Sequence, residues 1–145
     1  MDYQEIKRIL TTLKLASDDP HTQVSCYIKT LKYGSKYGTV YGSNRSTDGV
    51  VLSGEKLERP NKYIWIEHAE RNAIYKAAKL GIKLDKATMF TTHFPCNECA
   101  RAIVQSGINR LYYMDEKVNS DTEYHFKESF LILEYGGVFV EKLFE

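Results

Sequence analysis

The sequence contains few of the residues that mark secreted, nucleic-acid-binding or membrane-spanning proteins. Its 145 residues include only three cysteines and three prolines, and lysine plus arginine number 20 against 19 aspartates and glutamates. An odd, small number of cysteines does not fit a secreted disulfide framework. A formal charge of +1 argues against the basic face that binds DNA or RNA. The longest apolar runs, such as Phe130–Leu133, are far too short to cross a bilayer.

What the sequence does contain is typical of one globular domain. Apolar residues make up 43% of the chain and charged residues 27%, and a chain of this length can bury a core of its own. The segment Met1–Leu10 is charged and lacks the apolar stretch of a signal peptide. We therefore expect a single domain over residues 1–145, in a cytoplasmic protein that does not associate with membranes.

The spacing of apolar residues predicts helices and strands that alternate along the chain. Helices are expected over about 3–16, with Asp2 as N-cap, and over 67–80, 96–106 and 122–135. Strands are expected over about 22–30, 39–41, 87–92, 108–114 and 138–143. Residues 45–63 show no clear period and are predicted to form a loop, long enough to be a binding element or a lid. Alternation after the first hairpin indicates an α/β fold with a partly parallel sheet.

Two short motifs carry the residues capable of chemistry. They are His68-Ala69-Glu70 and Pro95-Cys96-Asn97-Glu98-Cys99. A C-x-x-C pair by itself is compatible with half of a structural zinc site, a redox pair, or two cysteines without a role. The sequence has no second C-x-x-C and no H-x-x-x-H, so the spacing does not supply a four-ligand zinc finger.

The expected positions of the two motifs bring them together. His68 and Glu70 are predicted in the first turn of one helix, and Cys96 and Cys99 in the first turn of the next. Both helices would begin at the same edge of the sheet, and a helix N-terminus stabilises thiolates. One imidazole and two thiolates leave an open position on a tetrahedral zinc, where bound water ionises near neutral pH. Glu70 could shuttle the proton of that water, so the spacing predicts a hydrolytic zinc centre.

H-x-E followed by P-C-x-x-C is the signature of the zinc-dependent nucleobase deaminases, and flanking residues extend the resemblance. The segments that resemble the deoxycytidylate (dCMP) deaminases are Asp19–Val24, Trp65–Ile74, Phe94–Ala100 and Gln105–Ile108. The resemblance implies a three-layer α-β-α cytidine deaminase-like fold around a five-stranded mixed sheet. It also implies zinc held by His68, Cys96 and Cys99, with Glu70 as proton shuttle. The implied reaction is the hydrolytic deamination of dCMP to dUMP and ammonia, which feeds dTMP synthesis.

The same resemblance implies regulation and assembly. Members of this family commonly form hexamers, and they bind dCTP as activator and dTTP as inhibitor. Mg²⁺ accompanies these triphosphates. We therefore expect a homo-oligomer with dCMP as its small-molecule substrate, possible effectors dCTP and dTTP, and Mg²⁺ bound together with the regulatory nucleotide.

Three residues are predicted to contact the substrate. Related deaminases bind the sugar through an asparagine at the end of the second strand, which is Asn44 here; the alternative is an asparagine that favours a turn. Tyr112 follows the cysteine helix, where the superfamily often places an aromatic ring against cytosine; the alternative is a core tyrosine. Arg45 is predicted to bind the 5′-phosphate, with Lys62 and Arg71 as further candidates, although single basic residues are mostly solvated.

Two other functions fit the same residues. The first is deamination of a free cytidine or deoxycytidine, or of a base in a polynucleotide, and the near-neutral charge counts against polynucleotides. The second is a non-catalytic interaction module that zinc stabilises. Glu70 argues against that module, because a structural zinc site does not need a carboxylate beside an open coordination position.

Overall fold

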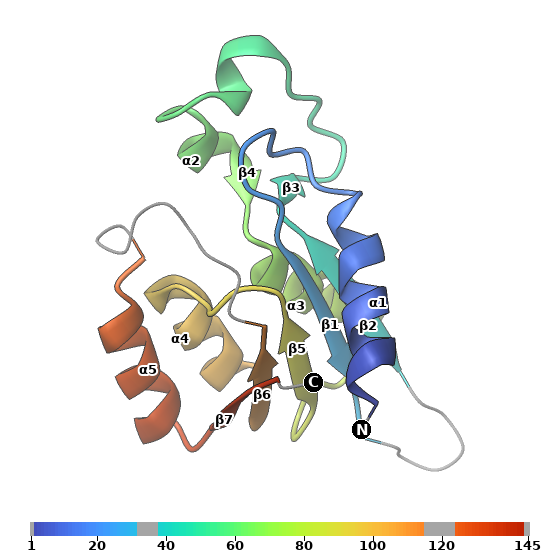
Figure 1. Cartoon of the computed structure of the whole chain (residues 1–145), viewed down its shortest axis with the longest axis vertical. Coiled ribbons are helices and arrows are strands. Elements are labelled where there is room, and N and C mark those ends of the chain that lie inside the picture. Colours follow the sequence, from blue (N-terminus) through green and yellow to red (C-terminus); the bar gives the residue numbers. More distant parts are fainter. Residues whose placement is uncertain (1, 32–37, 115–123, 144–145) are drawn as a thin grey trace.

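A five-stranded mixed sheet forms the centre of the protein. The structure is a computed structural model that describes residues 2–31, 38–114 and 124–143. The strands lie in the order β2-β1-β5-β6-β7 (Figure 1). Their bounds are β1 (Ser25–Lys29), β2 (Thr39–Ser43), β5 (Thr88–Thr91), β6 (Arg110–Tyr113) and β7 (Phe139–Lys142). β1 is antiparallel to both β2 and β5, whereas β5, β6 and β7 are parallel to one another. The predicted mixed sheet is confirmed.

Helices cover both faces of this sheet, which gives the predicted three layers. The long helices are α1 (Tyr3–Lys14), α3 (Ala69–Leu80), α4 (Asn97–Gln105) and α5 (Phe126–Tyr135). Residues of α3, α4 and α5 share one hydrophobic core with the sheet, and residues of α1 share a second core with its other face (Figure 1). Successive side chains of a strand point to opposite faces of the sheet, so one strand contributes to both cores. Ile28 and Met89 belong to the first core, and Tyr27 and Phe90 to the second.

The first helix shows how the local sequence sets these layers. The Asp2 side chain caps α1 as predicted, because its Oδ1 accepts hydrogen bonds from the backbone N–H groups of Gln4 at 2.9 Å and Glu5 at 3.3 Å. Ile6 and Leu10, one turn apart, are the buried residues of this helix and pack on Tyr27 and Phe90. Within the described ranges, the helices are too short and too polar to cross a bilayer.

The segment predicted as a loop over residues 45–63 contains short regular elements, so that prediction is wrong in part. These elements are β3 (Arg45–Ser46), the single 3₁₀ turn η1 (Gly54–Leu57) and the start of α2 (Lys62–Trp65). β3 pairs with β4 (Ile66–Glu67) as a two-stranded ladder separate from the main sheet. Elements of two to four residues are too short to show an apolar period, which explains why the sequence pattern missed them.

Several predicted boundaries shift by a few residues. α3 and α4 begin one or two residues later than expected, so that His68 and Cys96 are N-caps with extended backbone instead of first-turn residues. β1 begins at Ser25 instead of at about residue 22, and α5 begins at Phe126. Residues 122 and 123 of the predicted last helix lie outside the described residues. Element ends are the least reliable part of a prediction from spacing.

The topology brings the starts of α3 and α4 to one edge of the sheet. β2 and β5 run in the same direction because both are antiparallel to β1, and α3 and α4 follow them in the chain. Gly42 allows α3 to approach β2 closely, because a Cβ at this position would lie 2.8 Å from the Ala73 backbone nitrogen.

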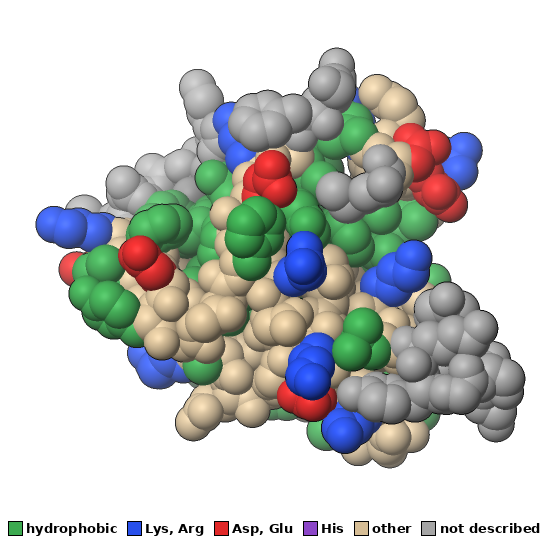
Figure 2. Space-filling view, turned by 90° about the horizontal axis from the view of Figure 1, so that it is seen from below, with side chains coloured by type: hydrophobic (Ala, Val, Ile, Leu, Met, Phe, Trp, Pro, Cys, Tyr) green, Lys and Arg blue, Asp and Glu red, His purple; other side chains and the backbone are tan. Residues whose placement is uncertain are grey.

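The opposite end of the molecule carries charges of both signs. Figure 2 views this end and shows lysine and arginine side chains interspersed with aspartate and glutamate side chains, without a continuous basic patch among the residues described. This distribution agrees with the near-balance of 20 basic and 19 acidic residues in the sequence.

Candidate metal centre

The starts of α3 and α4 bring one histidine and two cysteines into a single cluster. The Nδ1 atom of His68 lies 3.4 Å from the Sγ atoms of both Cys96 and Cys99. The three potential ligand atoms lie within 4.8 Å of one another, and no fourth His, Cys, Asp or Glu belongs to this group in the described part of the chain. The structure therefore brings together the three residues that the sequence motifs singled out.

The N-cap positions of His68 and Cys96 explain this convergence. Each residue has an extended backbone (φ −72°, ψ 149° for His68 and φ −69°, ψ 171° for Cys96) immediately before its helix. The Sγ of Cys96 accepts a hydrogen bond from the Cys99 backbone N–H at 3.4 Å, as Ser or Asp does at other N-caps. The positive end of α4 therefore faces the sulfur atoms.

The three donor atoms of the cluster fit a cation, and the surroundings of the two thiols affect their pKa values in opposite directions. Hydrogen bonds from the Cys99 thiol and from His68 lower the pKa of Cys96 to about 4, although burial acts in the opposite direction. Burial, the hydrogen bond to Cys96 and the charge of Glu70 raise the pKa of the Cys99 thiol well above its usual value. A divalent ion would let both thiols ionise. One nitrogen and two sulfur donors are the ligand types that zinc prefers.

Glu70 lies beside the cluster in the first turn of α3. Its side chain is buried, with the residue 4% exposed, and its Oε1 accepts a hydrogen bond from Thr91 Oγ1 at 3.5 Å. Burial raises the pKa of this carboxyl group, which brings it closer to the range useful for proton transfer near neutral pH. Glu70, His68 and Cys96 all line the same cavity.

That cavity opens to solvent beside the metal-ligand cluster, and its enclosed volume is about 70 Å³. Aromatic rings from Phe94, Tyr124 and Phe126 line it together with the polar side chains of Asp19 and Lys62. These aromatic residues were not predicted as site residues. Phe94 directly precedes the P-C-x-x-C motif, and this position is the one sequence feature that could have indicated that it lines the site.

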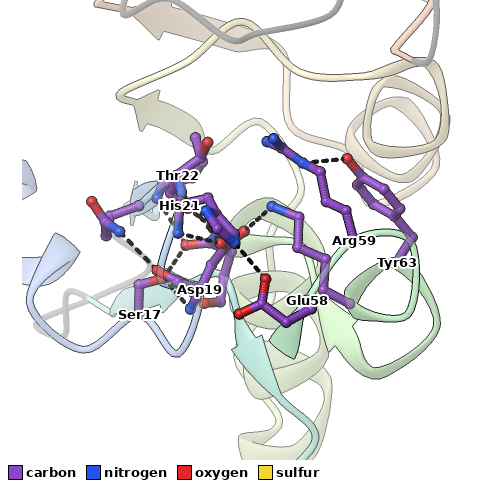
Figure 3. Close-up of polar contacts among 11 residues, drawn as sticks. Ser17, Asp19, His21, Thr22, Glu58, Arg59 and Tyr63 are labelled. Carbon is purple, nitrogen blue, oxygen red and sulfur yellow. Dashed lines mark hydrogen bonds and ion pairs between the residues drawn. The ribbon is translucent and has the colours of Figure 1, made fainter. Parts of the chain in front are cut away.

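A buried ion pair forms part of the cavity lining. Lys62 Nζ lies 2.7 Å from Asp19 Oδ2, and the two side chains are 4% and 7% exposed. Asp19 Oδ1 also accepts hydrogen bonds from the backbone N–H groups of His21 at 2.8 Å and Thr22 at 3.2 Å, and Figure 3 shows Asp19 at the centre of these contacts. Burial would raise the pKa of Asp19, but these hydrogen bonds and Lys62 lower it overall.

Asn44 lies at the cavity, and its amide is already hydrogen-bonded within the protein. Its Oδ1 accepts from the Val24 N–H at 2.8 Å and from Ser17 Oγ at 2.6 Å. Its Nδ2 donates to the Thr22 carbonyl oxygen at 2.7 Å. These bonds hold the turn before β1 against the end of β2, so the predicted contact of Asn44 with substrate stays a prediction.

Arg45 and Tyr112 do not line this cavity, and their predicted contacts with the substrate stay predictions. Arg45 is half-exposed, lies 3.9 Å from Asp18 Oδ2, and lines a separate groove. Tyr112 stacks on Phe90 with ring centroids 5.4 Å apart, in the core beneath α1. Strand alternation is the reason: it turns Tyr112 toward α1 and Tyr113 toward the other face, where Tyr113 contacts Phe94 of the cavity.

Comparisons with known proteins agree with this geometry. The family model described as "Cytidine and deoxycytidylate deaminase zinc-binding region" matches residues 2–115. The ComE operon protein 2 of Bacillus subtilis is 38% identical over 135 residues, which cover 90% of this chain and 65% of that protein. A probable deoxycytidylate deaminase of Caenorhabditis elegans is 32% identical over 116 residues, 79% of this chain and 58% of that protein. The chain thus spans less than two thirds of these relatives.

A solved structure resembles the whole chain. The dCMP deaminase of cyanophage S-TIM5, in complex with dCMP and dUMP, matches with a TM-score of 0.71 and 27% sequence identity. The match covers 99% of each chain. The likeness therefore includes both helix starts and the sheet edge between them.

Proposed function

Because the chain belongs to the cytidine and deoxycytidylate deaminase zinc-binding family, we propose that it hydrolyses dCMP to dUMP and ammonia. The match over residues 2–115 confirms the resemblance predicted from the sequence motifs. The observation that carries the proposal is the position of buried Glu70 beside the His68, Cys96 and Cys99 cluster, in the lining of one cavity. The likeness to a dCMP deaminase in complex with dCMP and dUMP supports the choice of nucleotide.

His68, Cys96 and Cys99 would hold a catalytic Zn²⁺. Bound zinc supplies a Lewis acid that lowers the pKa of water at its open position. The residues of this chain prepare the site for it: the α4 N-terminus faces the thiolates, and His68 presents Nδ1 to both sulfur atoms.

Glu70 would move the protons of the reaction. Its carboxylate would take one proton from the attacking water and give it to ring N3 of cytosine. It would then take the remaining proton of the hydroxyl on C4 and give it to the departing amine. The bond from C4 to the water oxygen would form first, and the bond from C4 to the exocyclic nitrogen would break afterwards, so dCMP and water give dUMP and ammonia. Burial of Glu70 keeps its carboxyl group away from bulk solvent during these transfers.

The cavity lining would bind the rest of the nucleotide. Phe94, Tyr124 and Phe126 offer rings against which a base can stack, a contact worth about 1–3 kcal/mol. Lys62, which the sequence offered beside Arg45 as a candidate for the 5′-phosphate, lines this cavity. Its ammonium group has three N–H bonds and donates one hydrogen bond, to Asp19, among the residues described. A 5′-phosphate at the cavity would accept from the others.

Regulation and assembly stay predictions that rest on the family resemblance alone. They comprise activation by dCTP, inhibition by dTTP, Mg²⁺ bound with these nucleotides, and a hexamer. The supply of dUMP for dTMP synthesis and a cytoplasmic location are predictions of the same kind. Sedimentation of the purified protein with and without dCTP and Mg²⁺ would test the assembly directly.

Turnover of dCMP, deoxycytidine, cytidine and a dC-containing single-stranded oligonucleotide by the zinc-loaded protein tests the proposed function. We expect kcat/KM for dCMP to exceed that for deoxycytidine at least about tenfold, because the nucleoside lacks the charge-assisted hydrogen bonds of its phosphate. Lys62→Met should narrow this difference, and Lys79→Met, at an exposed ion pair with Asp48, should leave it unchanged. Equal rates for dCMP and deoxycytidine would contradict the nucleotide assignment, and no deamination at all would favour the zinc-stabilised interaction module.

A further inference from the structure

One arginine side chain connects the two helix starts that carry the metal-ligand cluster. Arg71 Nε donates to Glu67 Oε1 at 2.6 Å, and its Nη1 donates to Glu98 Oε2 at 2.9 Å. Glu67 directly precedes His68, and Glu98 lies between Cys96 and Cys99. Arg71 thus joins the imidazole side of the cluster to its thiol side.

The contacts to Glu67 fix this connection at the α3 start. Glu67 Oε1 accepts hydrogen bonds from Arg71 Nε and from the His68 backbone N–H at 2.9 Å, and Arg71 Nη2 lies 2.6 Å from the same oxygen. The Arg71 side chain is only 17% exposed. A planar guanidinium with donors in fixed directions suits a bridge between two carboxylates better than a flexible ammonium does.

The charge of Arg71 also suits its position. Cys96, Cys99 and Glu70 place potential negative charge at this end of the helices, and Glu67 and Glu98 add two carboxylates on its outer side. Burial would lower the pKa of Arg71, but nearby Cys99 and the two carboxylates raise it overall. The guanidinium therefore stays charged at every working pH.

We propose that Arg71 is a positioning residue whose bridge between Glu67 and Glu98 holds His68 and the two cysteines in register and slows the release of zinc. This role follows from the contacts of the three side chains, which we call the Arg71 clasp. It rests on the proposed zinc site and does not depend on which cytosine compound is the substrate. Partners outside the ligand shell commonly change metal affinity about 10- to 100-fold.

The test is the rate of zinc transfer from the purified, zinc-loaded protein to an excess of a chromogenic chelator. Arg71→Met removes the clasp, and we expect zinc release about tenfold faster or more. Arg71→Lys keeps the charge without the two-directional fork and should give an intermediate rate. The matched control is Lys76→Met, which removes one positive charge from an exposed position of the same helix and should release zinc at the wild-type rate.

Melting temperatures with and without bound zinc separate positioning from a general structural role. The clasp predicts that Arg71→Met narrows the difference between the zinc-loaded and zinc-free melting temperatures, relative to Lys76→Met. Unchanged zinc release in Arg71→Met, or an equal loss of melting temperature in both forms, would overturn the proposal, and so would a wild-type protein that binds no zinc. A wild-type protein that binds zinc and does not deaminate dCMP would contradict the proposed function and leave the clasp intact.

Discussion

Lys62 Nζ lies 2.7 Å from Asp19 Oδ2, and both side chains are buried in the lining of the cavity that contains the metal-ligand cluster. Such a pair differs from a surface salt bridge, because removal of one partner leaves the other as an uncompensated buried charge, which destabilises the fold. Asp19 is also tied to the backbone of the turn that follows it, through His21 and Thr22. The pair therefore links the stability of this turn to the shape of the cavity.

Removal of either partner of this pair should destabilise the protein strongly. Asp19→Asn leaves the buried Lys62 ammonium without its carboxylate, and Lys62→Met leaves the carboxylate without its ammonium. We expect each change to lower the free energy of unfolding by about 3–5 kcal/mol, and the double variant to lose less than the sum. Urea denaturation of wild type, the two single variants and the double variant measures this coupling. If each single variant loses less than about 1 kcal/mol of unfolding free energy, the pair behaves as an exposed salt bridge.

The same pair predicts a stability that depends on pH at the acid end. Burial would raise the pKa of Asp19, yet the hydrogen bonds from Lys62, His21 and Thr22 hold it below its usual value of 3.8. A carboxyl group with a lower pKa in the folded state stabilises the fold above the unfolded pKa and loses this contribution as pH falls through the folded pKa. The difference in unfolding free energy between wild type and Asp19→Asn should be constant from about pH 5 to 7 and shrink below about pH 4. A difference that grows on acidification would contradict this assignment.

Asn44→Ala should destabilise the fold as well as alter the cavity. The change leaves the Val24 N–H and the Thr22 carbonyl without their side-chain partner, whereas the Ser17 hydroxyl keeps its bond to the Asn44 backbone carbonyl; a buried group left unsatisfied costs about 1–3 kcal/mol. We expect a loss of about 2 kcal/mol or more in chemical denaturation. Asn61→Ala, which removes an exposed hydrogen bond to Glu55, is the control and should cost far less. A variant of Asn44 with wild-type stability and weakened dCMP binding would instead place this side chain on the substrate.

Gly42→Ala should weaken the metal centre from a distance. A methyl group at Gly42 would lie 2.8 Å from the Ala73 nitrogen and 3.1 Å from its Cβ, so α3 would have to move away from β2 and carry His68 and Glu70 with it. We expect a lower melting temperature together with faster zinc release. Gly49→Ala meets no atom within 4 Å, so its cost should be limited to the strain of a positive φ, about 1 kcal/mol. Equal effects of the two substitutions would argue against close helix packing at Gly42.

Much of the fold could be predicted because its long elements have clear apolar periods. Ile6 and Leu10 on α1, and the alternating strand residues Tyr27 and Ile28, show in the sequence which side faces a core. The convergence of His68 with the cysteines follows from the topology, because both helices begin at one sheet edge. The positions of His68 and Cys96 as N-caps could not be predicted in this way, because a one-residue shift of a helix start leaves the apolar period unchanged.

The substrate side of the site was less predictable. Arg45 and Lys62 are both basic residues near the motif, and only the tertiary structure shows that Lys62 turns into the cavity and Arg45 into another groove. Tyr112 and Tyr113 are neighbours in a strand, so choosing the one that faces the site requires knowing which helix covers which face. Tyr124, just before α5, and Phe126, at its start, also line the cavity. Both residues are distant in sequence from the two motifs, so the motifs gave no sign of them.

The proposed role of Glu70 beside a catalytic zinc is tested by the rate of dUMP formation from dCMP by wild type and Glu70→Gln, each measured together with its zinc content. Glu70→Gln keeps the size of the side chain and all three metal ligands but removes the group that moves the protons. We predict one zinc per chain in both proteins and a rate at least about 100-fold lower in the variant. Equal rates at equal zinc content, or a wild-type protein with one zinc per chain and no dUMP formation, would contradict this role.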